Sequence, residues 1–195
     1  QAEADAHFAE PPYLPEHLAD PDVSLQAPHY TVAARNELAT LPGITPDGKT
    51  ILTSDEILQL KEIPKSLDVI GAGAVGNEFA STFADLGSEV TILEALPKIL
   101  PGLDKDVANV VVRSFKKKKI DIRTGVPVTG HRPRDKGGTV VTFGDNEELK
   151  VDVVIVSVGR RPFADALGLE GTGVVVSQRG FVEVDEFCAT GEPGV

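Results

Sequence analysis

The 195-residue sequence predicts an α/β fold with a parallel sheet. Two observations predict this class. Short apolar runs alternate with stretches of helical periodicity, a pattern typical of strand–helix–strand units. One such unit, residues 67–94, carries three glycines at the spacing G-x-G-x-x-G directly after an apolar run. Motif and context together indicate a Rossmann-like βαβ domain that binds a dinucleotide, although a glycine-rich turn of another α/β protein is the alternative.

Each glycine of this motif has a distinct expected task. After the strand Val69-Ile70, Gly71 permits the tight turn into the helix. Gly73 lacks a Cβ, so the backbone can approach a pyrophosphate, and Gly76 lets the helix pack closely on the strand. The first helical turn, with Ala74 and Val75, directs free N–H groups and the positive end of the helix dipole toward the phosphates.

The helix is expected from about Ala74 to Leu86, where Gly87 ends it. Its buried face is expected to consist of Val75, Phe79, Phe83 and Leu86. A second apolar strand, residues 90–93, then ends in the carboxylate of Glu94. This carboxylate is placed to accept hydrogen bonds from the adenosine ribose and to repel a 2′-phosphate, so the sequence favours NAD over NADP.

The composition excludes several classes of function. Asp and Glu number 30 against 19 Lys and Arg, and the net charge of −11 argues against binding to nucleic acid or to an anionic membrane. No apolar run is long enough to span a membrane, and no signal peptide is visible. Cys188 is the single cysteine, so a reducing compartment, the cytoplasm, is expected.

The N-terminal residues are unusual. The sequence begins with Gln1 and contains no methionine, which indicates a processed piece, an excised fragment or an incomplete record. Residues 1–28 are acidic and rich in proline, so irregular structure is expected there. The spacing of His7, His17 and His29 fits no metal motif, and no metal site is expected.

Two further helices are expected on either side of the glycine-rich unit. The first begins near Ser54, with Ser54 or Thr53 as its N-cap, and ends before Pro64. The second begins at Asp104 and continues through Lys118. The residues expected on its buried face are Val107, Val110, Val111, Ser114 and Phe115. The four lysines at residues 116–119 are expected to complement the helix dipole, with a phosphate-binding patch as the alternative.

The remaining strands complete the sheet and add an antiparallel β-meander. Residues 120–122 predict a third parallel strand. Residues 126–132 and 139–143 are expected to pair in antiparallel fashion around a turn at Asp135-Lys136-Gly137-Gly138. The nearly continuous apolar run at residues 151–158 is expected in the middle of the parallel sheet.

Several segments, in the right order, carry a family resemblance. They are Leu41-Pro42-Gly43-Ile44, Ile63-Pro64-Lys65-Ser66, residues 69–78, residues 87–94, Pro97, Ser157-Val158-Gly159-Arg160-Arg161-Pro162 and Val182-Glu183-Val184-Asp185. Over about residues 29–195 the chain resembles the dihydrolipoamide dehydrogenases, which are flavin disulfide oxidoreductases.

The resemblance implies further site residues besides the glycines and Glu94. Val128 matches a contact on the adenine side, and Gly159 matches a backbone position near the nucleotide. Glu78 matches a carboxylate between the nicotinamide and the flavin. The alternatives are that Val128 is a core residue and that Glu78 only complements the helix dipole.

The departures from the family pattern are as informative as the matches. The chain has no second glycine-rich unit for FAD, no redox-active cysteine pair and no C-terminal interface domain with a His–Glu acid–base pair. Ala33-Ala34-Arg35-Asn36 stands where the family has a glycine-containing turn on the flavin side. Residues 1–36 and 162–195 are therefore expected to be partial FAD-domain segments that flank an NAD-binding domain at residues 37–161.

The function implied by the resemblance is that of one portion of a flavoprotein. The parent enzyme passes a hydride from reduced FAD to NAD while it reoxidises dihydrolipoamide of a lipoyl-bearing 2-oxo acid dehydrogenase complex. The expected cofactor of this chain is NAD; FAD is not expected on the chain alone, no catalytic residue is assigned, and the chain alone is expected to be inactive. The alternative is a freestanding, non-catalytic NAD-binding or interaction module.

Overall fold

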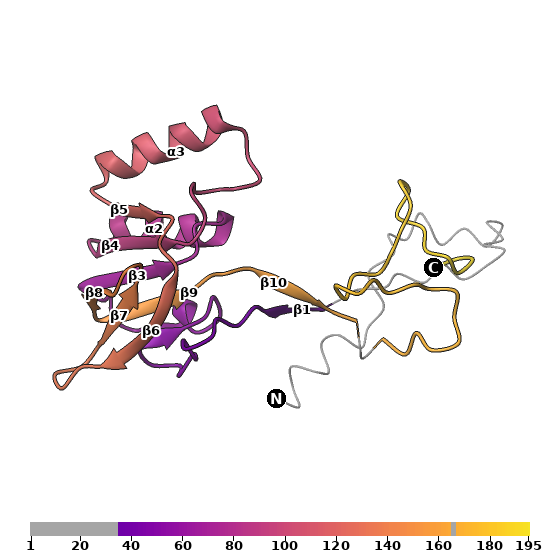
Figure 1. The fold of residues 1–195 in the computed structure, drawn as a ribbon, viewed down its shortest axis with the longest axis horizontal. Helices are drawn as coiled ribbons and strands as arrows, with labels where there is room; N and C mark the ends of the chain where they lie inside the picture. The colour runs from indigo at the N-terminus through magenta and orange to yellow at the C-terminus, as the bar shows by residue number, and fades with distance from the viewer. Residues whose placement is uncertain (1–34, 165–166) are drawn as a thin grey trace, which may run out of the picture. The chain divides into compact units, whose positions relative to one another are not determined.

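The computed structural model describes residues 35–164 and 167–195. The chain divides into two compact units, one of which is Ala34–Phe163. This unit contains all the helices and strands named below, and the described C-terminal residues belong to the other unit (Figure 1). The sequence placed the NAD-binding domain at residues 37–161.

A five-stranded parallel sheet forms the centre of the unit, as the sequence predicts. Its strands, in spatial order, are β2 (Ile51–Leu52), β9 (Val153–Val156), β3 (Ser66–Ile70), β4 (Glu89–Glu94) and β5 (Asp121–Thr124). Every neighbouring pair in this sheet is parallel. The α/β fold class predicted from the sequence is therefore confirmed.

A second, three-stranded antiparallel sheet is inserted between β5 and β9. It consists of β6 (Val128–Pro133), β7 (Thr139–Phe143) and β8 (Glu147–Val151), as the predicted meander requires. The predicted single strand at residues 151–158 is wrong at its beginning, because Val151 ends β8 and the inner strand β9 starts at Val153. Asp152 separates the two strands, and its backbone N–H donates to Ser66 Oγ over 3.0 Å.

The two faces of the parallel sheet bury separate apolar clusters. Odd-numbered residues of β3, Leu67 and Val69, pack on the helical side with Phe83 and Phe115. On the opposite face, Ile70 packs against the meander. This second cluster consists of Ile44, Ile51, Ile70, Leu93, Val141, Phe143, Val151, Val154 and Val156. The unit is thus built in three layers, with the parallel sheet in the middle.

The helix after the glycine-rich turn is α2 (Ala74–Asp85), close to its predicted bounds. Its predicted buried face is partly wrong: Val75 and Leu86 are 41% and 52% exposed, and only Phe83 of that set is buried. The buried residues of α2 are Gly76, Asn77, Ala80 and Phe83. The contact face is shifted because Gly76 is the point of closest approach to the strand, and Val75, one position earlier, faces about 100° away.

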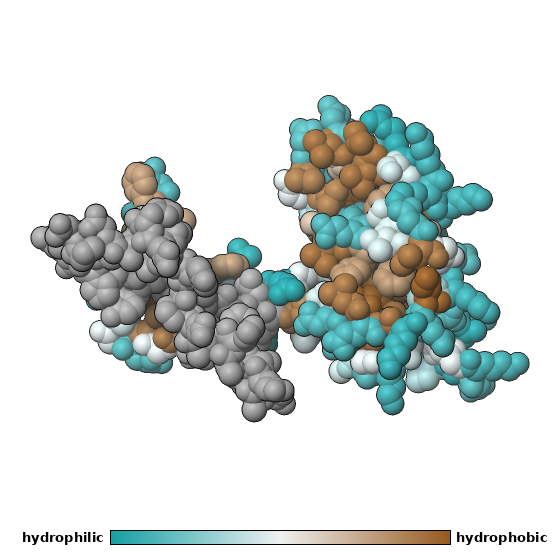
Figure 2. All heavy atoms as spheres, turned by 180° about the vertical axis from the view of Figure 1, so that it is seen from behind, coloured by the Kyte–Doolittle hydropathy of each residue, from teal (hydrophilic) through white to brown (hydrophobic). Residues whose placement is uncertain are grey.

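Helix α3 (Lys105–Lys117) begins as predicted, because Asp104 caps it by accepting from the N–H of Asp106 over 2.8 Å. Its buried residues are Ala108 and Phe115, whereas the predicted core residues Val107 and Val110 are 51% and 57% exposed. Only a narrow stripe of α3 therefore packs on the sheet. Figure 2 shows that apolar side chains remain at the surface of this unit among the hydrophilic ones.

The helix predicted from Ser54 is wrong in extent. The structure has only a short 3₁₀ helix, η2 (Ile57–Gln59). The expected start signal is present, since Glu56 Oε2 accepts from the N–H of Thr53 over 2.7 Å. The helix does not continue because Ile57 alone in η2 is buried, while Leu58 is 76% exposed, so packing does not stabilise further turns.

The ends of the unit are joined by a two-stranded antiparallel ribbon of β1 (Arg35–Leu38) and β10 (Arg160–Phe163).

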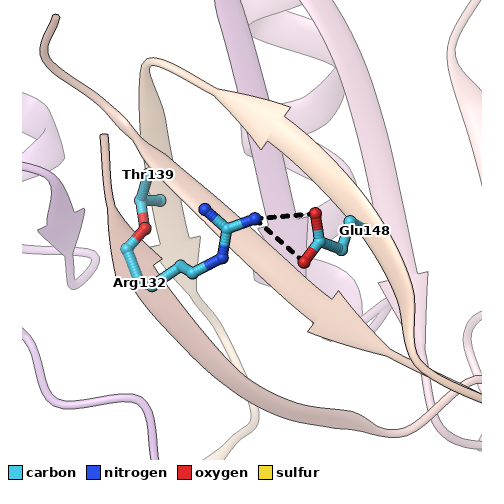
Figure 3. Close-up of polar contacts among 3 residues, drawn as sticks. All are labelled: Arg132, Thr139 and Glu148. Atoms are coloured by element: carbon cyan, nitrogen blue, oxygen red, sulfur yellow. Dashed lines mark hydrogen bonds and ion pairs between the residues drawn. The ribbon is translucent and has the colours of Figure 1, made fainter. Parts of the chain in front are cut away.

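On the meander, Arg132 of β6 forms an ion pair with Glu148 of β8. A single guanidinium nitrogen, Nη2, donates to both carboxylate oxygens, over 3.0 and 2.8 Å (Figure 3). Thr139 Oγ1 also donates to the carbonyl of Arg132 (2.9 Å). Both charged side chains of the pair are exposed, so its contribution to stability is small.

Candidate functional site

A hollow of about 560 Å³ lies at the carboxyl ends of β3, β4 and β9. The strand order reverses here: β4 lies on one side of β3 and β9 on the other. Open parallel sheets bind ligands in the crevice at such a point. Most of the residues that line it come from the glycine-rich turn, the end of β4, the start of β6 and the connection from β9 to β10.

The three motif glycines differ in what a side chain would meet. A Cβ at Gly71, whose φ is +102°, would stand 2.3 Å from the carbonyl oxygen of Ser157. A Cβ at Gly76 would stand 2.0 Å from the carbonyl oxygen of Gly71. At Gly73 a Cβ would meet nothing within 4 Å. The turn therefore requires glycine at two positions for its own packing, and at Gly73 it leaves open space beside the backbone.

The N-terminus of α2 opens into this hollow. Gly73 is the N-cap and supplies no side-chain cap, and the first turn contains no acidic residue. Ala74 and Val75 line the hollow, and the amides of a first helical turn have no acceptor within their own helix. The positive end of the helix dipole thus faces the hollow, and the first turn of α2 itself contributes no acidic side chain there.

Glu94, the last residue of β4, is only 8% exposed and is held by two backbone groups. Its Oε2 accepts from the N–H of Ala72 over 2.6 Å, and its Oε1 accepts from the N–H of Leu96 over 2.8 Å. The carboxylate therefore ties the end of the second strand to the glycine-rich turn. Sequence reasoning missed these bonds, although each oxygen keeps a further lone pair that can face a ligand.

The other predicted site residues of the hollow come from two segments of the chain. Val126, Pro127 and the half-buried Val128 form one apolar side, at the start of β6. Gly159, with φ +107°, and Arg160 lie beyond β9. The structure therefore brings Val128 and Gly159 together with the glycine-rich turn and Glu94, as the family resemblance implies. Gly76 lies beneath the glycine-rich turn and is not part of the lining of the hollow.

Glu78 is a predicted site residue that the structure places at a different depression. It is exposed on α2 and borders a separate depression of about 460 Å³, beside Ile57 and Leu58. The lysines at residues 116–119 are also not among the residues that line the hollow. Lys118 Nζ pairs with Asp85 Oδ2 at 2.5 Å and bonds Ser81 Oγ at 2.8 Å, a contact between helices α2 and α3 rather than a phosphate site.

The described residues contain no group of three or more His, Cys, Asp or Glu side chains placed to hold a metal ion. His131 Nδ1 lies 3.1 Å from Thr139 Oγ1. His7, His17 and His29 lie outside the described residues. No helix within residues 35–164 and 167–195 is long and apolar enough to cross a bilayer.

Comparison with known proteins identifies the family. Residues 31–195 match the pyridine nucleotide-disulphide oxidoreductase family. The chain belongs to this family. Curated relatives of this chain include the dihydrolipoyl dehydrogenase of Thermus scotoductus, 39% identical over 87% of this chain and 38% of the relative. Another is the dihydrolipoyl dehydrogenase of Bacillus subtilis, 42% identical over 74% of this chain and 32% of the relative.

Solved structures agree with this assignment. LpdA from Mycobacterium tuberculosis has a TM-score of 0.74 at 28% identity, covering 82% of this chain and 34% of its own. The HOCl-induced flavoprotein disulfide reductase RclA from Escherichia coli has a TM-score of 0.71 at 33% identity, covering 84% of this chain and 37% of its own. The resemblance to dihydrolipoamide dehydrogenases is therefore confirmed, and this chain spans about a third of the length of such relatives.

Proposed function

We propose that this chain is the NAD(H)-binding portion of a flavoprotein similar to dihydrolipoamide dehydrogenase. The observation that carries the proposal is the hollow at the carboxyl edge of the sheet. There the open space at Gly73, the uncapped N-terminus of α2 and the carboxylate of Glu94 meet. This combination fits a pyrophosphate that is linked to a ribose.

Each part of a dinucleotide has a suitable place in the hollow. The pyrophosphate would lie beside Gly73, within reach of the first-turn amides that include Ala74 and Val75. The adenosine would lie between Glu94 and the apolar side at Val128. Gly159, where a Cβ would meet nothing within 4 Å, would leave the backbone accessible to the nicotinamide half. NAD supplies the hydride-accepting carbon, and the protein residues supply orientation.

Glu94 supports the preference for NAD over NADP. Its carboxylate is nearly buried and already accepts two backbone N–H groups, which hold it in place at the end of β4. A free lone pair on either oxygen can accept from a ribose hydroxyl. A 2′-phosphate at the same place would bring two negative groups together with little water between them, which is unfavourable.

The wider function depends on the rest of the parent protein. In the whole enzyme the nicotinamide would receive a hydride from reduced FAD, with Glu78 on the flavin side, while a lipoyl-bearing 2-oxo acid dehydrogenase complex supplies dihydrolipoamide. The 195 residues contain a single cysteine, Cys188, whereas disulfide exchange needs two thiols. We therefore expect the chain alone to lack dehydrogenase activity. We also expect it to hold no stoichiometric FAD, because its one complete glycine-rich turn, at residues 71–76, is assigned to NAD. One cysteine also fits a reducing compartment such as the cytoplasm.

The experiment that tests the proposal is calorimetric titration of the chain with NAD⁺ and with NADP⁺. The unmutated chain should bind NAD⁺ more tightly. Glu94→Gln keeps an oxygen acceptor but removes the negative charge, so the affinities for NAD⁺ and NADP⁺ should differ less than in the unmutated chain. Glu89→Gln is the matched control, because Glu89 is an exposed carboxylate at the start of the same strand. Absence of NAD⁺ binding would refute the proposal, and equal affinity for both cofactors would refute the role of Glu94.

A further inference from the structure

The side chain of Asn77 bonds the glycine-rich turn from inside the protein. Asn77 lies in α2 and is 6% exposed. Its Nδ2 donates to the carbonyl oxygen of Ala72 over 2.7 Å and to that of Gly73 over 2.7 Å. One amide nitrogen thus holds two successive peptide groups in a fixed orientation toward each other.

The orientation of these carbonyls decides where the next N–H groups point. The peptide bonds of this turn are trans, since none of the described residues has a cis peptide bond, and in a trans peptide the C=O and the following N–H point in opposite directions. Because the carbonyls of Ala72 and Gly73 point inward to Asn77, the N–H groups of Gly73 and Ala74 point away from the protein interior. Both residues line the hollow, so these two donors face it.

Other groups hold the same turn, but each of them binds only one peptide. Leu100 N–H donates to the carbonyl of Ala72 (2.8 Å), and the backbone N–H of Asn77 donates to that of Gly73 (3.0 Å). The carboxylate of Glu94 binds the N–H of Ala72. The side chain of Asn77 adds the link between the two peptides. It does so at a cost, since its Oδ1 is buried and has no hydrogen-bond partner.

We propose that Asn77 is a positioning residue that presets the N–H groups of Gly73 and Ala74 to bind a diphosphate. The inference rests on the proposed nucleotide site and names the side chain that orients its donors. A buried amide whose oxygen has no hydrogen-bond partner is not the residue that stability by itself would favour at this position. Replacing it with an apolar residue of similar size should therefore leave the fold at least as stable and impair binding of the diphosphate.

The test compares Asn77→Leu with Asn109→Leu, the same substitution at an exposed position of α3. The ligands are NAD⁺, ADP and adenosine, of which adenosine has no phosphate. Asn77→Leu should unfold at the same temperature as the unmutated chain or higher. It should bind NAD⁺ and ADP roughly tenfold more weakly, with adenosine unchanged, because charge-assisted hydrogen bonds are the ones impaired. Asn109→Leu should change none of the three affinities.

Other outcomes overturn the proposal. Unchanged NAD⁺ and ADP affinity in Asn77→Leu would show that the donors need no such positioning. An equal loss for adenosine, or a lower unfolding temperature, would show a purely structural role. If Asn77→Leu does not fold, Asn77→Ala replaces it, and failure of both variants to fold also assigns Asn77 to stability alone.

A separate measurement distinguishes this inference from the proposed function. If the unmutated chain binds no NAD⁺, the proposed function fails, and inorganic pyrophosphate becomes the probe. The NMR signals of the Gly73 and Ala74 amides should then shift with pyrophosphate in the unmutated chain and not in Asn77→Leu. No shift in the unmutated chain would overturn the inference as well.

Discussion

Replacing Asp68 with asparagine should stabilise the protein, and the gain should grow with pH. Asp68 lies in β3, is fully buried, and neither of its carboxylate oxygens has a hydrogen-bond partner. Its neighbours across the strands are Thr91 and Val154. Desolvation raises the pKa of this carboxyl well above its ordinary value near 3.8, against a smaller lowering by the positive charge of Arg123.

The sign of the pH dependence follows from where each state releases its proton. The unfolded chain loses the Asp68 proton near its ordinary pKa, whereas the folded protein retains it to higher pH. Raising the pH from about 4 therefore favours the unfolded state by about 1.4 kcal/mol per unit until the folded pKa is passed. If the carboxyl is still protonated at pH 7, the loss reaches about 4 kcal/mol, which is the upper limit for this group at that pH.

Urea denaturation of the unmutated chain and Asp68→Asn between pH 4 and pH 8 measures this effect. The two free energies of unfolding should nearly coincide at pH 4, where a neutral carboxyl and a neutral amide of similar size are compared. They should then separate by up to about 4 kcal/mol at neutral pH. Asp145→Asn, at an exposed position in the β7–β8 turn, is the control and should show no such separation. A difference that does not change with pH, or a variant less stable at pH 7, would refute the reasoning.

Three further predictions follow from the same structure. In urea denaturation, Gly76→Ala should lower the free energy of unfolding by about 2 kcal/mol or more, since its Cβ would overlap a carbonyl oxygen. Gly73→Val, whose side chain would enter open space, should keep its stability and bind NAD⁺ more weakly in calorimetry. Equal losses of stability in the two variants would contradict the assigned packing. Glu94→Ala should lower the free energy of unfolding by about 1–3 kcal/mol, because two backbone N–H groups lose their acceptor, and an unchanged denaturation midpoint would contradict this. Lys118→Ala should cost less than about 1 kcal/mol in the same assay, because its partner Asp85 is 61% exposed, and a larger loss would show that the contact between α2 and α3 is underestimated.

The sequence predicted the glycine-rich unit well because its determinants are local. An apolar strand, glycines at fixed spacing and a terminal carboxylate define β3, α2 and β4 without reference to the rest of the chain. Helix α3 was likewise predicted from its cap at Asp104 and from its periodicity. Strand order and the hollow then follow from the right-handed crossovers of such units.

What the sequence did not reveal depends on contacts between distant segments. Glu94 was expected to face a ribose, but its bonds to Ala72 and Leu96 depend on how the turn and the end of β4 meet in space. Asn77 had no motif to mark it, because its role depends on two carbonyls one turn away. The failed helix near Ser54 had a valid start signal, but only tertiary packing could have extended it, and Ile57 alone was buried.

The β1–β10 ribbon brings the two ends of the Ala34–Phe163 unit side by side. The chain enters at Arg35 and leaves at Phe163, and these two residues are directly paired across the ribbon. Paired residues of antiparallel strands have their Cα atoms only about 5 Å apart, so a linker of a few residues could join them. New termini could then be opened in the β6–β7 turn at Gly137, which is exposed and borders no part of the hollow. The Ala34–Phe163 unit is therefore well suited to circular permutation and to insertion into a loop of another protein.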